Sequence, residues 1–278
     1  LTWRIRITTK KIQGEGFGFD AKTTSEYDEK KNFGGFGQLN MNYRKNGLEL
    51  GAYAFGARQY QPDNKDFQQK TYLDKTWNQK SKIRQVGIIE AMNFRLDASY
   101  QLDANNSIGA NFGFLRNPKQ TWNGDMSSSI LQDEELSENS DSHADFFWQK
   151  NNLSSNIYYV GKIGKLSIDF NTDWLWSKEY QNDVTKEQYQ EVGMNAQSQT
   201  AHSLTNKDYH LLASKLVLSY PLLGGNLSLG GEYSNTHRTS KYQVVPTNLV
   251  SDDNSRITES MTSSFLTYSR DFGNLSLE

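Results

Sequence analysis

The chain has 278 residues, of which 35% are hydrophobic, a formal net charge of -2 and a mean hydropathy of -0.78. An α-helical membrane protein is excluded, because no stretch approaches the roughly 20 apolar residues that a spanning helix needs. The near-neutral charge argues against a nucleic-acid partner, which calls for a strongly basic face. The absence of cysteine excludes disulfides, thiolate catalysis and cysteine-ligated zinc. A membrane-spanning β-barrel stays compatible with the low hydropathy, because only alternate residues of its strands face lipid.

The chain begins with two alternating segments. Trp3 to Lys10 is too short to span a membrane. The next segment, Gly14 to Thr24, places Phe17 and Phe19 on one face. Its glycines could suggest a phosphate-binding loop, but no helical pattern follows to supply an N-terminus for the anion, so we interpret the segment as a strand.

Further alternating segments follow, joined by short and long connections in turn. Strands are predicted over 38–43, 47–60, 83–102, 107–114, 153–160, 166–177, 209–220, 227–234 and 260–270. Tight turns are predicted near Asn46, Asn105, Ile163, Gly224 and Gly273, and long polar loops over about 61–82, 117–145, 181–207 and 244–257. Asn46-Gly47 is a dipeptide that tolerates the positive φ angles of a hairpin turn. Within the loops, Ser127 to Glu138 and Asp183 to Val192 each start with a residue that caps helices, and could form short helices.

The clearest alternation lies between Leu166 and Ser177. Its apolar face consists of Leu166, Ile168, Phe170, Thr172, Trp174 and Trp176. A side-chain period of two indicates a β-strand with one apolar and one polar face. About a dozen residues is long for a soluble protein but suits a tilted strand that crosses ~25–30 Å of hydrocarbon. The pattern therefore predicts a transmembrane β-barrel strand, with lipid on one face and an aqueous lumen on the other.

The order of connections places all tight turns at one end of an up-and-down meander and all long loops at the other. This asymmetry is typical of outer-membrane barrels, which have short periplasmic turns and long external loops. The prolines, Pro62, Pro118, Pro221 and Pro246, all fall in predicted connections, where a missing N–H breaks no ladder bond. Four tyrosines lie within a few residues of tight turns: Tyr43, Tyr100, Tyr220 and Tyr268. We interpret them as part of a periplasmic-side aromatic girdle, with the ordinary β-propensity of tyrosine as the alternative.

A family resemblance accompanies this pattern. Ile5 to Lys11, followed by Gly14 to Phe19, is similar to the junction in TonB-dependent receptors where the plug domain gives way to the first barrel strand. The strands that follow look like the TonB-dependent-receptor-like outer-membrane proteins of the Bacteroidetes. The resemblance implies a 22-stranded barrel with an N-terminal plug, which imports scarce nutrients with energy from TonB. The implied partners are the outer-membrane bilayer, TonB through the plug, and a surface lipoprotein as a further candidate.

The expected fold class is all-β: an antiparallel meander of about 10–11 long strands, part of a transmembrane barrel in the bacterial outer membrane. Residues 1–13 are expected to end a plug domain, and 14–278 to form a partial barrel. Because the chain starts at Leu1 and 274–278 resembles the opening of another strand, we expect a fragment, the N-terminal half of a barrel. Half a barrel leaves its edge strands unpaired, which predicts an open, strongly curved sheet.

Ligand recognition is expected at the loop end of the lumen. The candidate residues are Arg58, Trp77, Arg84, Trp122 and Trp148, because indole rings stack on ligands and guanidinium groups pair with anions. Alternatively, Trp122 and Trp148 belong to the outer aromatic girdle or pack loops together. No cofactor is expected.

No metal or catalytic site is expected either. The four histidines, His143, His202, His210 and His237, show no metal-ligand spacing, and the acidic segment 132–145 lacks the periodicity of an EF-hand. Some outer-membrane barrels are proteases with Asp and His at the loop end, where Asp141, His143, Asp183 and His202 fall, but no nucleophile motif appears.

The sequence thus predicts part of a non-enzymatic, TonB-dependent-receptor-like transporter for a scarce nutrient. The alternatives are a surface adhesin or structural barrel without transport activity, an outer-membrane protease, and a soluble β-sandwich. Long strands and the one-sided placement of long loops argue against the sandwich.

Overall fold

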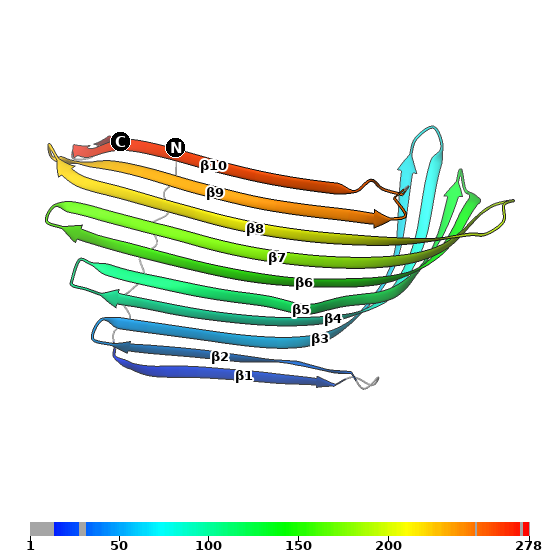
Figure 1. The fold of residues 1–278 in the computed structure, drawn as a ribbon, viewed down its shortest axis with the longest axis horizontal. Coiled ribbons are helices and arrows are strands. Elements are labelled where there is room, and N and C mark those ends of the chain that lie inside the picture. The colour runs from blue at the N-terminus through cyan, green and yellow to red at the C-terminus, as the bar shows by residue number, and fades with distance from the viewer. Residues whose placement is uncertain (1–13, 28–31, 248, 273–274, 278) are drawn as a thin grey trace.

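A computed structural model describes residues 14–27, 32–247, 249–272 and 275–277, which form a single curved layer of antiparallel strands (Figure 1). The strands pair strictly in chain order, each with its sequence neighbours. Their bounds are β1 (Gly16–Tyr27), β2 (Phe33–Lys45), β3 (Leu48–Tyr72), β4 (Thr76–Gln101), β5 (Ser107–Gln132), β6 (Glu135–Ile163), β7 (Leu166–Glu191), β8 (Gln197–Leu222), β9 (Gly225–Val245), β10 (Asp253–Phe272) and β11 (Leu275–Leu277). The predicted all-β meander, including the start of an eleventh strand, is confirmed.

The sheet is open. Across the described ranges, β1 pairs with β2 alone and β11 with β10 alone, so the two edges do not meet. The expectation of an open antiparallel sheet is confirmed. In the same ranges, no helix has the length and apolar character to cross a membrane. The predicted plug segment 1–13 lies outside the described residues, and so does the turn predicted at Gly273.

Short turns close one end of the hairpins as predicted. Asn46 and Gly47 adopt φ angles of 50° and 79°, the left-handed pair that a two-residue hairpin turn requires. Leu223 and Gly224 do the same, with φ angles of 50° and 74°. At the third turn, Asp103 accepts hydrogen bonds from the Asn105 backbone N–H at 2.7 Å and from Asn106 Nδ2 at 2.6 Å.

Three of the four predicted long polar loops, 61–82, 117–145 and 181–207, are wrong. The fourth, near 244–257, is confirmed in its middle, because β9 ends at Val245 and β10 begins at Asp253. Strands β3 to β8 run for 25 to 29 residues each, so the segments assigned to loops continue the sheet as long hairpins. Their turns are short, for example 73–75 and 133–134, and the tips of the β3–β4 and β5–β6 hairpins bend away from the rest of the sheet (Figure 1). These strands carry polar side chains on both faces, so their sequence shows no alternation of apolar and polar residues. The backbone hydrogen bonds of the ladder form all the same, because they do not depend on side-chain polarity.

The predicted helices and three of the four proline positions need the same correction. Pro221 lies inside β8, whereas Pro246 lies in the connection after β9, as predicted. Ser127 to Glu138 belongs to β5 and β6, and Asp183 to Val192 falls almost wholly in β7. Pro62 lies inside β3, at a level where the described pairing with β2 has already ended, so its missing N–H can face the unpaired side. Pro118 lies at a bulge of β5, where the register shifts against both neighbours.

A single layer has almost no interior. Val244 is the one buried hydrophobic side chain that the described part of the chain shows, whereas Phe19 is 70% exposed and Leu96 56%. Backbone hydrogen bonds between strands therefore hold this layer together. Its large apolar side chains are exposed on the surface, which is typical of a surface that contacts another apolar phase or molecule.

Candidate functional site

The register sorts side chains onto two faces. Directly paired residues share a face, and the pairs Phe17–Tyr43, Tyr43–Leu50 and Leu50–Ala98 fix which face is apolar. On β1 to β10 this face carries an apolar band, made mainly of residues 17, 19, 21, 39, 41, 43, 48, 50, 52, 54, 94, 96, 98, 100, 108, 110, 112, 114, 153, 157, 159, 168, 170, 174, 176, 212, 216, 218, 220, 227, 229, 233, 266 and 268. The band is longest on β7 and β8, where it spans nine residues (168–176 and 212–220), about 27 Å. With a barrel tilt of about 45° it covers ~20 Å of depth there.

Charged and polar residues mark where the band stops on the same face. Arg58 pairs with Glu90 across β3 and β4, and Arg116 and Lys178 occupy the next row on β5 and β7. Beyond this border, β3 to β8 continue for about fifteen residues each, roughly 50 Å. We call these parts the extensions; they comprise 58–72, 76–90, 116–132, 135–151, 178–191 and 197–210.

The opposite face is polar, and its side chains bond to each other both along a strand and between strands. Arg95 donates from Nε and Nη2 to Asp97 Oδ1 at 3.0 and 2.9 Å. Lys215 Nζ lies 2.6 Å from Glu232 Oε1. Asn156 Nδ2 donates to Asp173 Oδ1 at 2.8 Å. Such a face is stable against water and unfavourable against lipid.

Two hollows lie on the polar face. One, of about 420 Å³, is lined by Asn40, Tyr53, Asn93, Arg95 and Asp97. The other, of about 190 Å³, is lined by residues that include Asn171, Asp173, Lys215 and Glu232. Both present charges of either sign together with amide or hydroxyl groups, so they suit a polar, hydrogen-bonding solute. The strand alternation already placed Arg95 and Asp97 opposite Phe94 and Leu96, but β3 was too weakly patterned to bring Tyr53 beside them.

The structure brings together only part of the predicted ligand set. Trp122 and Trp148 lie on the polar side of the extensions, on adjacent strands and diagonal to each other, since Trp122 pairs with Phe146 and Trp148 with Gln120. Trp122 also covers Gly87, where any Cβ would lie 2.9 Å from the indole ring. Trp77 shares this face but lies ten residues along β4 from Gly87, roughly 33 Å away.

Arg58 and Arg84 lie on the other face, the one that continues the apolar band. Each is paired with a carboxylate: Arg58 with Glu90, and Arg84 with Asp66 at 2.7 Å. The hydrogen bond from Arg84 lowers the pKa of Asp66 below its ordinary value, and Asp66 raises the pKa of Arg84 in return. These two arginines therefore do not join Trp122 and Trp148, and a role for any of the five in ligand binding stays a prediction.

The four tyrosines share a face and an end of the sheet. Tyr43, Tyr100, Tyr220 and Tyr268 all belong to the apolar face, a few residues from the short turns. Tyr100 and Tyr220 are each 44% exposed. The girdle assignment remains a prediction.

The acid–histidine pairs considered in the sequence, Asp141 with His143 and Asp183 with His202, are not hydrogen-bonded to each other in the described residues. His143 Nδ1 lies 2.7 Å from Asp125 Oδ1, and its Nε2 lies 3.6 Å from Asp145 Oδ2. His202 bonds Asn182, while Asp183 accepts from Ser203 on the other face. No group of three or more potential metal ligands gathers in the described part of the chain.

Comparisons with known proteins identify no family. No family model and no curated protein match the chain. Among solved structures, the siderophore receptor PiuA from Acinetobacter baumannii aligns with 7% identity and a TM-score of 0.30, covering 93% of this chain and 47% of the receptor. BauA, the ferric preacinetobactin receptor of the same species, aligns with 12% identity and a TM-score of 0.33, covering 93% of this chain and 46% of the receptor. The outer-membrane protease OmpT from Escherichia coli aligns with 10% identity and a TM-score of 0.32, covering 91% of this chain and 92% of the protease. The chain thus spans about half the length of the two receptors.

Proposed function

We propose that this chain forms part of an outer-membrane β-barrel that takes up a scarce nutrient, in the manner of TonB-dependent receptors. The observation that carries the membrane assignment is the apolar band, whose depth of ~20 Å on β7 and β8 is close to the ~25 Å apolar belt of bacterial outer-membrane barrels. In water the same band would be a large exposed apolar surface, which soluble monomers avoid.

Uptake is the further step of the proposal. Its support is the polar face, where hollows lined by Arg95 and Asp97, and by Lys215 and Glu232, offer hydrogen bonds to a polar solute. The resemblance of Ile5 to Lys11 and Gly14 to Phe19 to a plug–barrel junction adds the coupling to TonB. The proposal assigns no catalytic step to the chain.

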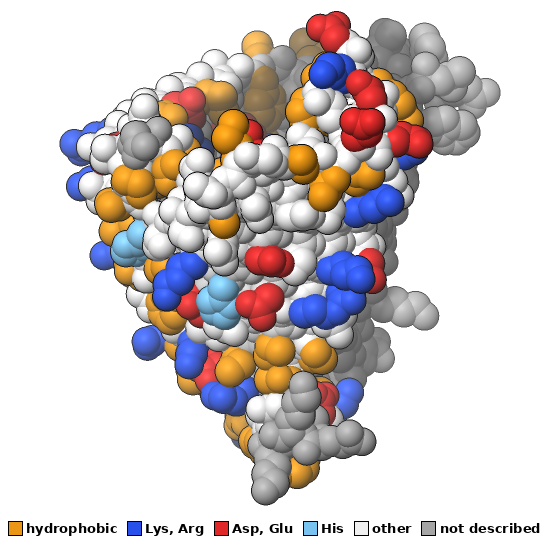
Figure 2. All heavy atoms as spheres, turned by 90° about the vertical axis from the view of Figure 1, so that its right-hand side faces the viewer, with side chains coloured by type: hydrophobic (Ala, Val, Ile, Leu, Met, Phe, Trp, Pro, Cys, Tyr) orange, Lys and Arg blue, Asp and Glu red, His pale blue; other side chains and the backbone are white. Residues whose placement is uncertain are grey.

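An adhesin or structural barrel is the second candidate, and the extensions favour it. In the extensions, about fifteen residues of each of six strands continue beyond the border at Arg58–Glu90. Acidic, basic and histidine side chains are interspersed over the end that carries the hairpin tips (Figure 2). A rigid polar surface of this kind can contact a partner outside the cell without any transport.

The membrane assignment is tested on the native protein in the cells that produce it. We expect it in the outer-membrane fraction, with heat-modifiable migration on a gel. Recovery in the soluble fraction, with no heat modifiability, would refute the barrel and turn the band into the core of a soluble assembly.

Transport is tested separately, by growth on limiting nutrients with and without the tonB gene. We expect deletion of this protein and deletion of tonB to cause the same, non-additive growth defect on one nutrient. A membrane-embedded protein whose deletion impairs surface attachment, but no nutrient uptake, would favour the adhesin.

A further inference from the structure

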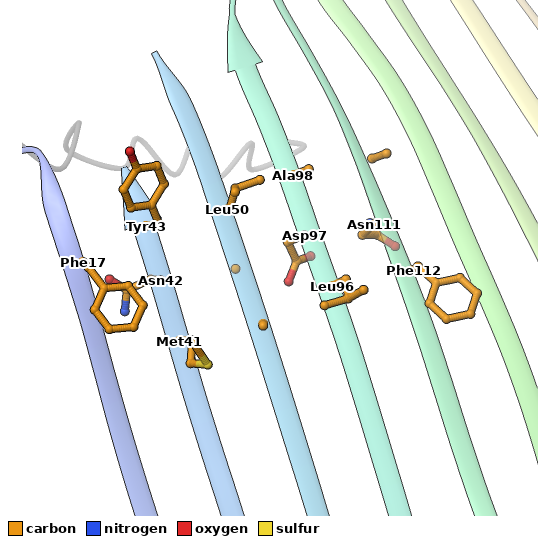
Figure 3. A pocket seen from close by; sticks show the side chains of 13 residues that line it. Phe17, Met41, Asn42, Tyr43, Leu50, Leu96, Asp97, Ala98, Asn111 and Phe112 are labelled. Carbon is orange, nitrogen blue, oxygen red and sulfur yellow. The ribbon is translucent and has the colours of Figure 1, made fainter. Parts of the chain in front are cut away.

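Three hollows follow one another along β3 on the apolar face. The first, about 540 Å³, lies between Phe17 and Met41 on one side and Leu96 on the other, over Leu50 and Ala52 (Figure 3). The second, also about 540 Å³, continues over Ala54 and Gly56. The third, about 500 Å³, shares Gly56 and Met92 with the second and reaches the Arg58–Glu90 pair. We call this continuous trough the β3 groove.

Side-chain size makes the groove. Its floor on β3 is Ala52, Ala54 and Gly56, and no atom lies within 4 Å of where a Cβ of Gly56 would stand. Its walls are larger: Leu39 and Met41 on β2, and Met92, Phe94 and Leu96 on β4. From Leu50 to Arg58 the groove runs about 26–27 Å along the strand, lined by almost wholly apolar atoms until its upper end.

Cations cap the upper end, where the band meets its border. Arg58 is half exposed and pairs with Glu90, which leaves most of its guanidinium donors free for a second acceptor. Arg116 on β5 lies directly opposite Met92 on β4. It is exposed and pairs with no carboxylate among the described residues. Two guanidinium groups against one carboxylate leave a net positive charge at the end of an apolar trough.

We infer that the β3 groove binds one acyl chain of a phosphorylated lipid, with the lipid phosphate held between Arg58 and Arg116. The inference rests on the proposed membrane location. An acyl chain is linear and apolar, like the groove, and it needs to reach only half of the ~30 Å hydrocarbon core. Arginine forks are the geometry of choice for phosphate oxygens. Free phosphate would leave the apolar groove empty, and an apolar protein segment would leave the cationic cap unused. The occupant is thus a lipid of the surrounding bilayer.

The experiment uses the purified protein, folded into phosphatidylcholine vesicles with a small amount of spin-labelled phosphatidic acid. We expect a motionally restricted lipid component that exceeds the one from spin-labelled phosphatidylcholine and is not displaced by inorganic phosphate. Gly56→Leu fills the groove and removes contact with two or three methylene groups, each worth about fourfold in affinity, so association should fall about tenfold or more. Arg116→Gln should lower the preference for phosphatidic acid and leave chain restriction largely intact.

Two variants serve as matched controls. Gly231→Leu adds the same side chain on the apolar face of β9, where a Cβ would meet only the Ser263 carbonyl oxygen at 3.8 Å. Lys178→Gln removes a cation from the same border on β7. We expect both controls to bind phosphatidic acid like the parent protein.

The outcomes separate the inference from the function on which it rests. Equal restriction of both lipids, or equal losses in Gly56→Leu and Gly231→Leu, would mean ordinary boundary lipid and overturn the groove. Displacement by inorganic phosphate would also overturn it. If the protein inserts and is heat-modifiable yet shows no preference, only the inference fails; if it does not insert, the membrane proposal fails with it.

Discussion

The apolar band and the extensions are built from the same strands and the same hydrogen-bond ladder, yet they suit different solvents. Within the band, β4 presents Phe94 and Leu96 on one face and Arg95 and Asp97 on the other. Within its extension, the same strand carries Lys82 and Arg84 on the face that the band made apolar. Backbone groups that are paired within the ladder are compatible with lipid and with water alike, so in the proposed membrane location the side chains decide where the lipid ends.

The extensions hold together through polar pairs rather than apolar contact. Ser81 and Ser128 bond at 2.7 Å on the polar side and are buried, at 2% and 7% exposure. Gln68 Nε2 donates to Asn78 Oδ1 at 2.6 Å near the tip. Because a neutral polar pair of this kind contributes only about 0.5–1.5 kcal/mol, the comparison predicts that the band sets the stability of the sheet and that the extensions follow it.

The largest expected effect comes from placing a charge in the middle of the band. On the proposed membrane location, Phe112→Arg puts a guanidinium at mid-depth on the apolar face of β5 and should lower the free energy of unfolding in vesicles by about 2–4 kcal/mol. Asn111→Arg places the same group one residue away on the polar face, beside Asp97, and should change stability little. Urea unfolding of both variants in lipid vesicles measures the difference. Equal effects at 111 and 112 would mean that the two faces see the same solvent.

A smaller effect is expected at the short turns that border the band. Gly47 has a φ of +79°, and a Cβ there would lie 3.0 Å from the Gln101 carbonyl oxygen, so Gly47→Val should cost about 1–2 kcal/mol. Gly164 has a φ of +60° with nothing within 4 Å of a Cβ, so Gly164→Val bears the conformational cost alone. Unfolding free energies of the two variants isolate the steric part. A larger cost at Gly164 would contradict the turn geometry.

The contrast between band and extensions also explains what the sequence could predict. Alternation such as Phe94–Arg95–Leu96–Asp97 specifies a strand and its faces, and Asn46-Gly47 specifies a turn, so the band and its short turns were predictable. The extensions alternate polar with polar, as in Ser127–Ser128–Ser129, which reads as a loop or a helix cap. Their strand structure is set by register continuing from the band, a long-range effect that no local window contains.

The candidate site was predictable to the same extent. Faces were assigned correctly for Arg95 and Asp97, but Arg58 and Arg84 lie in segments without alternation, and their face depends on register with β4. The β3 groove depends on the sizes of side chains that three strands bring side by side. These residues are far apart in the sequence. That Met41, Ala52 and Leu96 are neighbours follows only from the pairing of β3 with both β2 and β4.

If the extensions follow the band, removing one of them should leave the band intact. Replacing 64–84 with Asn-Gly keeps Asp63 opposite Gln85 and closes a short hairpin there. We expect heat-modifiable migration and protease resistance of the remaining sheet to be unchanged. Loss of heat modifiability, or new cleavage inside 48–56 or 92–101, would show that the extension stabilises the band.

The smallest expected effect is a difference in how salt changes the pKa values of two carboxylates, Asp103 and Asp66, which lie at opposite ends of the sheet. The pKa of Asp103 is lowered chiefly by the Asn105 backbone N–H and then by the Asn106 side chain, both neutral donors. The pKa of Asp66 is lowered chiefly by the charged Arg84 guanidinium. Both folded pKa values lie below the ordinary 3.8, so each group stabilises the fold above about pH 3.8, and this contribution disappears as the pH falls through the folded value.

Salt distinguishes the two causes. At 1 M ionic strength the screening length is about 3 Å, so the charge-assisted bond at Asp66 weakens, while amide bonds at Asp103 do not. We expect the NMR-detected pKa of Asp66 to rise toward its ordinary value in 1 M salt, and that of Asp103 to stay low. Arg84→Gln should reproduce the salt effect at Asp66 and leave Asp103 unaffected. A salt-insensitive Asp66 would mean that the extension face is shielded from water, and with it the border between lipid and solvent would have to move beyond Arg84.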